Sequence, residues 1–382
     1  MKFFDRKEPP KEDGGESEKK EKASNFKLKD LFARIVRKIT NLLSAPFGEF
    51  GEDEKELFER QFNPREYIEL YYPPIDKESV KHISDILARV EVREMGEDGV
   101  KLTKIDGRLL ARQFEHGSTE GKSIELLENY CIYDFVARKA LPAMLTKRPE
   151  DHFSVLDVGG GPTVYQHIPL LGVSDKITHA EYLEANRQEI ATWKQEKGYD
   201  WSSYIACWQS YLALHPEAYS MAMKDVRDVL DNLSTKDPSI YNQEMAKRIE
   251  DVIPVDVFSP NILSSQEGYD AVSVGKWGCV DLLTSHFCIE SATADPNRWR
   301  IGIGNIAKKV NEGGFLIMTA IRNAEWYKVG DNKLPAVPVD YTAIANELKK
   351  HGFKVLEGTE LLTHNQKEVG YDGMIFILVQ KQ

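Results

Sequence analysis

The spacing of apolar side chains divides the first 50 residues into two parts. Residues 1–25 are poor in apolar side chains and rich in Lys, Glu, Pro and Gly, which predicts a disordered tail. In residues 26–44 apolar side chains recur every three or four positions with basic residues between them, so we expect a basic amphipathic helix and linker over 26–50. Such a helix can lie on an anionic membrane surface or pack against the body of the protein or a partner, and the pattern leaves both open.

Residues 51–150 are expected to form an N-terminal helical cap with a β-hairpin inserted in it. Residues 52–72 have a helical pattern that ends in a run of aromatic side chains, and residues 123–146 suit a long helix. Residues 90–105 alternate between apolar and polar on both sides of the turn sequence GEDG, which is typical of a hairpin.

From about residue 150 short apolar runs alternate with helical segments, which indicates an α/β domain over residues 151–382. Helices are expected at 184–197, 297–310 and 340–351, with a polar helical insertion at 216–251. Strands are expected at 153–158, 177–182, 252–257, 315–321, 353–356 and 373–380, with 269–274 and 280–285 as alternatives for one more. No helical segment separates the last two strands, so we expect an antiparallel hairpin at the edge of a mostly parallel sheet.

The composition is that of a folded chain without a membrane span. Hydrophobic residues make up 41% of the 382 residues, enough for a substantial core. The net charge of −11 makes the chain a poor general ligand for nucleic acid, whose binding depends on neutralising phosphates. No apolar run approaches the ~18 residues that a spanning helix needs, and the N-terminus lacks the apolar core of a secretory signal. Residues 26–47 hold five basic side chains and one acidic one. If the chain contacts an anionic surface, we expect this segment to make the contact.

The cysteines and histidines predict neither a disulfide scaffold nor a metal site. The four cysteines form no CxxC pair, and the nine histidines include no HExxH motif. We therefore expect a reducing, cytoplasmic compartment and no metal ion.

A glycine-rich turn is the strongest chemical signal in the chain. The segment LDVGGGPTVY follows a predicted strand, and glycines there let the backbone turn tightly and approach a ligand closely. Glu181 lies 20 residues after Gly161, at the end of the next strand, where a carboxylate can accept hydrogen bonds from the ribose of a nucleotide cofactor. The third glycine of the dinucleotide fingerprint is replaced by Val164, which favours S-adenosylmethionine and leaves a nicotinamide-dinucleotide oxidoreductase as an alternative. Asp157 either orients the cofactor through water or only caps the loop.

Several segments together resemble one family. They are FNPREYIELYY (62–72), LDVGGGPTVYQ (156–166), EYLEAN (181–186), VDV (255–257), the stretch 312–339 and the closing YDGMIFILVQK. The chain resembles the nicotinamide, phenylethanolamine and thioether/indolethylamine methyltransferases, which depend on S-adenosylmethionine, over most of 52–382. The resemblance implies a Rossmann-like class I methyltransferase fold. Its mostly parallel seven-stranded sheet would carry helices on both faces and an antiparallel C-terminal edge hairpin.

The resemblance also implies cofactor-binding residues. Tyr67 and Tyr72 would cover the methionine end of the cofactor, and Glu181 would hold the ribose with Asn186 nearby. The residues implied for the amino-acid part are Gly159, Gly161, Thr163 and Tyr165. Those implied beside the adenine are Asp256 and Val257, and His286 or Phe287 would lie beside the sulfonium.

Structural roles are open for some of these residues. Tyr67 and Tyr72 could be helix-packing aromatics, Asp256 a strand-end cap and His286 a core histidine whose hydrogen bonds are satisfied.

The expected chemistry is methyl transfer to an amine nitrogen of a small molecule. Aromatic faces attract a sulfonium, so Tyr67, Tyr72 and Tyr327 are candidates to surround it and form a lid. Asn323 is a candidate amine contact, as are Glu325, Glu368 and Asp372. The resemblance implies a carboxylate and a serine for nicotinamide where this chain has Thr319 and Ala336, so nicotinamide is not the expected acceptor. We expect a cytoplasmic monomer without nucleic acid. The alternative is a non-catalytic or regulatory methyltransferase-fold protein with a peripheral membrane-binding arm at 26–44.

Overall fold

The structure, a computed structural model, describes residues 54–74, 91–107, 123–149, 152–215, 232, 235–263, 278–363 and 366–382. The chain divides into two units, residues 1–49 and residues 50–382. The tail predicted for 1–25 and the amphipathic helix and linker predicted for 26–50 lie outside the described residues, as does the alternative strand at 269–274. None of the described helices is both long enough and apolar enough to cross a membrane.

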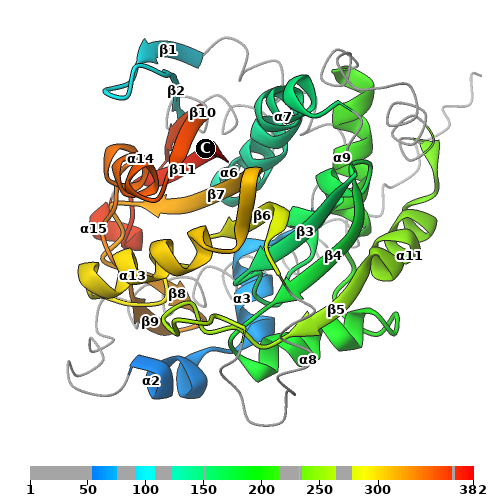
Figure 1. Cartoon of the computed structure of the whole chain (residues 1–382). Coiled ribbons are helices and arrows are strands. Elements are labelled where there is room, and N and C mark those ends of the chain that lie inside the picture. The colour runs from blue at the N-terminus through cyan, green and yellow to red at the C-terminus, as the bar shows by residue number, and fades with distance from the viewer. Residues whose placement is uncertain are drawn as a thin grey trace, which may run out of the picture. The chain divides into compact units, whose positions relative to one another are not determined.

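A sheet with strand order β1-β2-β10-β11-β7-β6-β3-β4-β5 forms the centre of the second unit (Figure 1). Strands β3 (Phe153–Val158), β4 (Ser174–Ala180), β5 (Ile249–Ile253), β6 (Val280–His286) and β7 (Val310–Arg322) are all parallel. Strand β11 (Gly373–Lys381) lies antiparallel between β7 and β10 (Phe353–Leu362). The seven strands from β10 to β5 are the mostly parallel sheet that the sequence predicts.

The hairpin predicted at 90–105 is present as β1 (Glu91–Met95) and β2 (Lys101–Asp106). Strand β2 also pairs in parallel with β10, from Gly358 opposite Leu102 to Leu362 opposite Asp106. The expectation that the C-terminal hairpin forms the sheet edge was therefore wrong. The backbone groups that β10 would expose as an edge strand are instead paired by β2, more than 200 residues earlier in the chain. No local sequence pattern reveals such a pairing.

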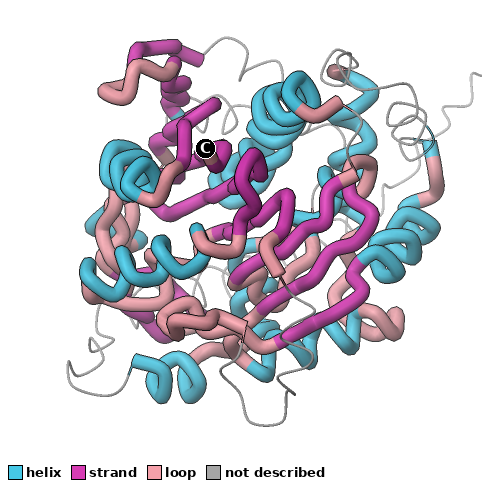
Figure 2. Tube along the Cα trace, in the orientation of Figure 1, coloured by secondary structure: helices cyan, strands magenta, loops and turns pink. Residues whose placement is uncertain are grey.

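Helices cover both faces of the sheet (Figure 2). Neighbouring strand residues point to opposite faces: Val155 and Leu282 belong to one core cluster, and Leu156 and Leu283 to the other. The first cluster is completed by α6 (Ser123–Phe135), the π-helical η1 (Val136–Ala140), α7 (Leu141–Lys147), η2 (Tyr165–Leu170), α8 (Glu184–Trp193), α9 (Ser202–Leu214) and α11 (Pro238–Arg248). The second is completed by α13 (Pro296–Ala307) and α14 (Tyr341–Lys350). Burial on both faces explains the continuous apolar runs of the central strands.

A third cluster of buried side chains lies beyond the carboxyl ends of the strands. It joins α2 (Glu54–Gln61) to the small hairpin of β8 (Trp326–Val329) and β9 (Asn332–Pro335), with α3 (Pro64–Tyr71) and the short α15 (Gln366–Val369) beside them. The single helix expected over 52–72 is thus two helices. Asn63 begins the second, because its side chain accepts hydrogen bonds from the N–H groups of Arg65 and Glu66 and Pro64 follows it.

Candidate functional site

A cavity lies at the carboxyl ends of β3, β4 and β6, the usual place for a ligand in an open α/β sheet. Its walls are the loop 159–161, the segments 181–183, 255–258 and 286–288, and a cover from α2, α3 and β8. We call it the main cavity. The residues predicted from the sequence that line it are Tyr67, Tyr72, Gly159, Gly161, Thr163, Tyr165, Glu181, Asn186, Asp256, Val257, His286 and Tyr327.

The glycine loop has a backbone shape that only glycine adopts readily. Gly159 and Gly161 have φ angles of 70° and 64°, in the left-handed region. A Cβ atom on Gly159 would lie 2.0 Å from Sγ of Cys288. Thr163 donates from Oγ1 to the Gly160 carbonyl over 2.9 Å, so the loop is held from within as well.

Glu181 connects the second strand to this loop. Its Oε2 accepts a hydrogen bond from the Gly161 N–H at 3.0 Å, and its Oε1 accepts from the Leu183 N–H at 2.9 Å and from Nδ2 of Asn186 at 3.0 Å. Burial raises the pKa of Glu181, against the opposing effect of these bonds. A carboxylate has about four acceptor positions and three are used, so about one remains, on Oε2, for a hydroxyl donor from the cavity.

Asp256 lies just past the end of β5 and is bound from two sides. Its Oδ1 accepts from the Phe258 N–H at 2.9 Å, and its Oδ2 pairs with Nζ of Lys55 at 2.6 Å. Lys55 belongs to α2 and also lies over the Tyr182 ring, 5.6 Å from its centroid. The sequence reasoning missed Lys55, because nothing local links a helix near residue 55 to a strand end 201 positions later.

The cover helix α2 is itself anchored beside the cavity. Glu54 accepts hydrogen bonds from Oγ1 of Thr293 at 2.9 Å and from the Ala294 N–H at 2.9 Å. It also pairs with Arg298 at 2.5 Å. These bonds hold the first turn of α2 against the segment before α13, so Lys55 and Phe58 face the cavity.

Tyrosine side chains form one wall of the main cavity. The ring centroids of Tyr67 and Tyr72 are 5.9 Å apart, and those of Tyr72 and Tyr165 are 4.7 Å apart. Burial raises the pKa of Tyr67 to about 12 and that of Tyr72 and Tyr327 well above the ordinary value. The hydroxyls are therefore neutral at pH 7, and the rings offer π-faces to a cation.

A second cavity adjoins this tyrosine wall. It shares Tyr67, Tyr72, Phe287, Ser291 and Tyr327 with the main cavity. Its other lining residues are Tyr71, Glu128, Asn129, Ile321, Tyr371 and Met374. Glu128 is buried and accepts from Oγ1 of Thr363 at 2.8 Å and from the Tyr371 hydroxyl at 3.3 Å. The second cavity is thus lined mainly by aromatic and apolar side chains, with one buried carboxylate among its described lining residues.

Two predicted site residues lie elsewhere. Asp157 is fully buried behind the glycine loop and is not among the residues that line either cavity. Asn323 likewise lines neither cavity. Strand β7 ends at Arg322, Asn323 takes a φ of 51°, and its Nδ2 donates to Oδ2 of Asp372 at 3.1 Å. The turn after β7 therefore directs Asn323 toward the start of β11, away from both cavities.

Buried acid–base groups surround the loop after β6. His286 lines the main cavity with Nδ1 3.0 Å from Oγ1 of Thr319, and burial lowers its pKa. Glu290, which the sequence reasoning missed, is buried and accepts from the Ile321 N–H at 3.0 Å. Burial raises the pKa of Glu290 to about 7. Its position in a loop after a strand was the only signal that could have marked it.

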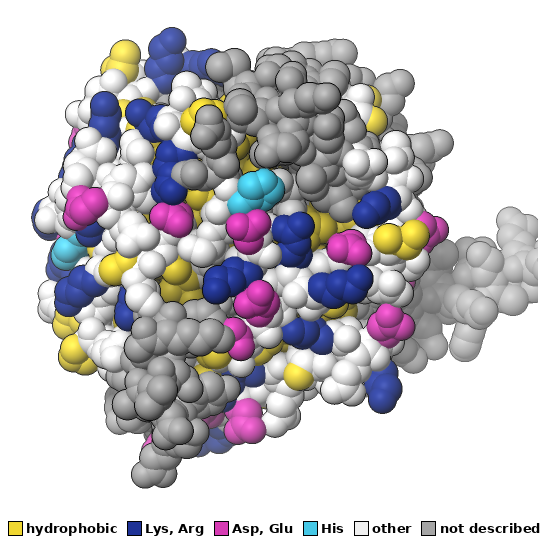
Figure 3. Space-filling model, turned by 45° about the vertical axis from the view of Figure 1, so that its right-hand side comes forward, with side chains coloured by type: hydrophobic (Ala, Val, Ile, Leu, Met, Phe, Trp, Pro, Cys, Tyr) yellow, Lys and Arg dark blue, Asp and Glu magenta, His cyan; other side chains and the backbone are white. Residues whose placement is uncertain are grey.

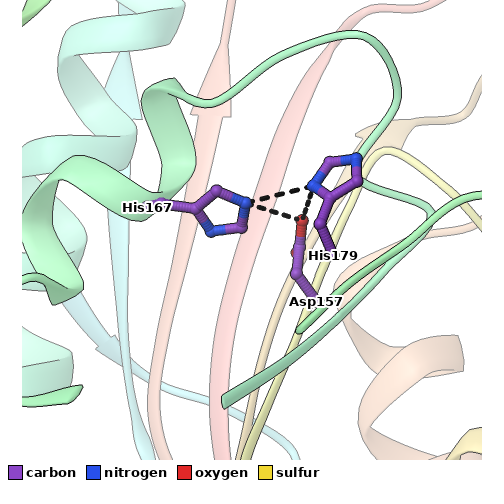
Figure 4. Close-up of side chains that lie close together, drawn as sticks. All are labelled: Asp157, His167 and His179. Atoms are coloured by element: carbon purple, nitrogen blue, oxygen red, sulfur yellow. Dashed lines mark hydrogen bonds and ion pairs between the residues drawn. The ribbon is translucent and has the colours of Figure 1, made fainter. Parts of the chain in front are cut away.

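Within the described residues, Asp157, His167 and His179 form a group that could hold a metal ion (Figure 4). Nε2 of His167 lies 3.2 Å from Nδ1 of His179 and 3.4 Å from Oδ2 of Asp157, and His179 Nδ1 lies 3.5 Å from the same oxygen. All three side chains are fully buried. The sequence predicted no metal site, and the spacing of these residues matches none of its motifs.

Comparison with known proteins identifies a family. A model described as the NNMT/PNMT/TEMT family matches residues 132–382. Human phenylethanolamine N-methyltransferase is 26% identical over 233 residues, which cover 60% of this chain and 73% of that protein. Nicotinamide N-methyltransferase of Caenorhabditis elegans is 25% identical over 248 residues (63% of this chain, 80% of that protein), and the human enzyme of that name is 21% identical over 309 residues (80% and 88%). The chain therefore belongs to the NNMT/PNMT/TEMT family, with its Rossmann-like fold, and is an S-adenosylmethionine-dependent N-methyltransferase.

Proposed function

We propose that the main cavity binds S-adenosylmethionine and that the enzyme methylates an amine nitrogen of a small molecule held in the second cavity. One observation carries the proposal: the Glu181 carboxylate and the glycine loop face the same cavity as Tyr67 and Tyr72 of the FNPREYIELYY segment. Curated relatives are named for phenylethanolamine and nicotinamide, both small nitrogen compounds. The acceptor class is inferred from those names together with the aromatic lining of the second cavity.

The residues that line the main cavity suit the parts of this cofactor. Glu181, with Asn186 beside it, would hold the ribose, and Asp256 and Val257 would flank the adenine. The residues proposed for the methionine part are Tyr67, Tyr72, Gly159, Gly161, Thr163, Tyr165 and His286. Gly161, whose Cβ would meet no atom of the described residues within 4 Å, leaves room for a close approach of the backbone to a ligand, whereas Gly159 packs on Cys288.

When bound, the cofactor supplies a methyl group on a positively charged sulfur. The protein must then align the acceptor nitrogen with that methyl, and good alignment is worth ~7–11 kcal/mol of barrier. We assign Tyr67 and Tyr327, which line both cavities, to surround the transfer point. Their neutral rings favour the cationic sulfur, and α2 excludes water above it. Asn323 lines neither cavity and would affect methyl transfer only by orienting Asp372, to which its Nδ2 donates a hydrogen bond.

The remaining proposals concern surroundings and partners. We expect a cytoplasmic monomer that does not bind nucleic acid; on the face drawn in Figure 3, basic and acidic side chains are interspersed rather than gathered into a basic stripe. The predicted helix at 26–44 would give weak contact with anionic membranes. Co-sedimentation with anionic vesicles should fall when residues 1–45 are deleted, and equal sedimentation would remove this proposal.

Calorimetry with S-adenosylhomocysteine tests the cofactor, and NADH serves as the competing nucleotide. Binding of the first and not of the second is expected. A screen of small amines with isotopically labelled methyl donor should then yield a methylated product. Absence of S-adenosylhomocysteine binding, or NADH binding in its place, would contradict the proposed function.

A further inference from the structure

The buried group behind the glycine loop has a proton arrangement that the structure determines. Nε2 of His179 lies 3.0 Å from the Gly161 carbonyl oxygen, and a carbonyl can only accept. The His179 proton is therefore on Nε2, and Nδ1 carries a lone pair. Burial lowers the pKa of His179 to about 4 and that of His167 to about 3, so both rings are neutral at pH 7.

The proton of His167 follows from the same reasoning. Its Nδ1 is buried and has no hydrogen-bond partner among the described residues. Its Nε2 faces two acceptors, Nδ1 of His179 at 3.2 Å and Oδ2 of Asp157 at 3.4 Å (Figure 4). Because an orphaned buried N–H is rarer than an orphaned acceptor, the proton belongs on Nε2. A metal ion would need lone pairs at both facing nitrogens, which would move the His167 proton to the unpartnered Nδ1. A chain of hydrogen bonds therefore fits better: Asp157 and His179 accept from His167, and His179 donates to Gly161. We call these three side chains the relay.

The relay ends on the loop that lines the main cavity. Its last member, His179, donates to Gly161, and the N–H of the same Gly161 donates to Glu181 at 3.0 Å. His179 on β4 and Glu181 just after it thus hold both backbone polar groups of one left-handed residue, Gly161. Gly160 packs directly on the relay, since a Cβ there would lie 2.4 Å from Cε1 of His179 and 2.2 Å from Oδ2 of Asp157.

We infer that His179, supported by His167 and Asp157, is a positioning residue that holds the glycine loop in its cofactor-binding shape. The inference rests on the proposed function, because it needs the loop to contact the cofactor. Asp157 is the fixed end of the relay: its Oδ1 accepts from Oγ1 of Thr284 at 2.7 Å, and its Oδ2 accepts from Nε2 of Gln166 at 3.1 Å. The loop is then shaped before the ligand arrives, and binding need not pay for its ordering.

A pair of variants at one position tests the role. His179→Leu removes the donor and keeps a similar volume, whereas His179→Gln keeps an amide N–H near the position of Nε2. We expect His179→Leu to weaken S-adenosylhomocysteine binding 5- to 30-fold, as loss of a buried hydrogen bond predicts, and His179→Gln to stay within 3-fold of the wild type. In turnover assays KM for S-adenosylmethionine should rise in His179→Leu with kcat within 2-fold, because the loop and not the acceptor is disturbed.

A merely structural histidine would lower Tm in both variants without changing the affinity of the folded protein. Equal affinity in wild type and His179→Leu, or equal loss in both variants, would overturn the inference. If the wild type itself fails to bind, the proposed function fails instead, so the two failures are distinguishable.

A second measurement reads the proton position in the wild type. Histidine ¹⁵N spectra of the wild type, in which the His179 signals are identified by their loss in His179→Gln, should show that ring neutral with the proton on Nε2. A proton on Nδ1 of His179 would contradict the relay. So would stoichiometric zinc in the purified protein, because the metal would occupy the lone pairs where the relay places a proton.

Discussion

The main cavity and the second cavity share a tyrosine wall but are built in opposite ways. In the main cavity, the glycine loop, Glu181 and Asn186 all come from residues 159–186. In the second cavity, Tyr71, Glu128, Ile321 and Met374 come from elements far apart along the chain. The main cavity is thus built around a local strand–turn–strand motif, which distant segments such as Lys55 and Asp256 complete, whereas the second cavity is assembled from distant segments throughout.

This difference has a chemical consequence. The main cavity presents backbone groups and a carboxylate whose positions are set by hydrogen bonds within the motif, such as that from Gly161 to Glu181. The second cavity presents rings and one carboxylate, Glu128, among its described lining residues. Substitutions of residues that line only the main cavity should therefore change the affinity for the cofactor alone. Substitutions of residues that line only the second cavity should change KM for the acceptor alone.

The largest effect is expected for Gly159→Ala. A left-handed φ costs an alanine roughly 1–2 kcal/mol, and the clash with Cys288 adds roughly 1–3 kcal/mol. S-adenosylhomocysteine affinity, measured by calorimetry, should fall by about 100-fold. Gly352→Ala is the control, because its φ is also positive at 83° but its Cβ would meet no atom within 4 Å. An equal loss of affinity in both variants would mean that global strain, and not the loop, is responsible.

A smaller loss of cofactor affinity is expected for Glu181→Ala. The change removes the acceptor for a ribose hydroxyl and for the Gly161 N–H, at a cost of roughly 1–3 kcal/mol. This corresponds to about 5- to 150-fold in Kd, or about 30-fold at the middle of the range. Glu184→Ala, an exposed carboxylate on the adjoining helix, should leave Kd unchanged. If Glu181→Ala also raised KM for the amine, the two cavities would not bind their ligands independently, and the contrast between a cofactor cavity and an acceptor cavity would fail.

The acceptor side is tested by Glu128→Gln, with a smaller effect. Removing this negative charge weakens the attraction of the second cavity for a basic molecule, so KM for the amine should rise roughly 3- to 10-fold, the equivalent of about 1 kcal/mol. S-adenosylhomocysteine affinity should not change. Glu357→Gln provides the control, because this partly buried carboxylate on β10 is not a lining residue of either cavity. Altered S-adenosylhomocysteine affinity with unchanged KM would reverse the assignment of the cavities.

The contrast also explains what the sequence could predict. The parallel strands, the glycine loop and Glu181 follow from local patterns, and the structure has them. Strand β5 is displaced: it spans 249–253 and not the expected 252–257, so it begins inside the segment predicted as a helical insertion. The pairing of β2 with β10, the Lys55–Asp256 contact and the place of Glu128 join segments more than 200 residues apart, and no periodicity encodes them. Asn323 was misplaced for a related reason: its left-handed φ of 51° reverses the direction that a continuing strand would give.

The smallest effect is expected where the cover meets the main cavity. Lys55 pairs with Asp256 at 2.6 Å, but its side chain is 39% exposed, so screening keeps the pair below about 1 kcal/mol. Lys55→Met should change S-adenosylhomocysteine Kd by less than about 3-fold. Its dissociation rate should rise by a similar factor, measured by stopped-flow, because α2 loses a contact that keeps the cavity closed.

Salt provides the decisive comparison for this contact. The difference between Lys55→Met and wild type should shrink as ionic strength rises, since an exposed pair is screened within a Debye length of ~10 Å at 0.1 M. Lys104→Met removes a lysine whose side chain is 40% exposed, against 39% for Lys55, from its pair with Glu94 in the β1–β2 hairpin. Neither Lys104 nor Glu94 lines a cavity, so this variant should leave the dissociation rate unchanged at every salt concentration. A rate increase in Lys55→Met that persists at high salt would mean that the lysine stem, packed beside Tyr182, closes the cavity by its apolar contacts and not by its charge.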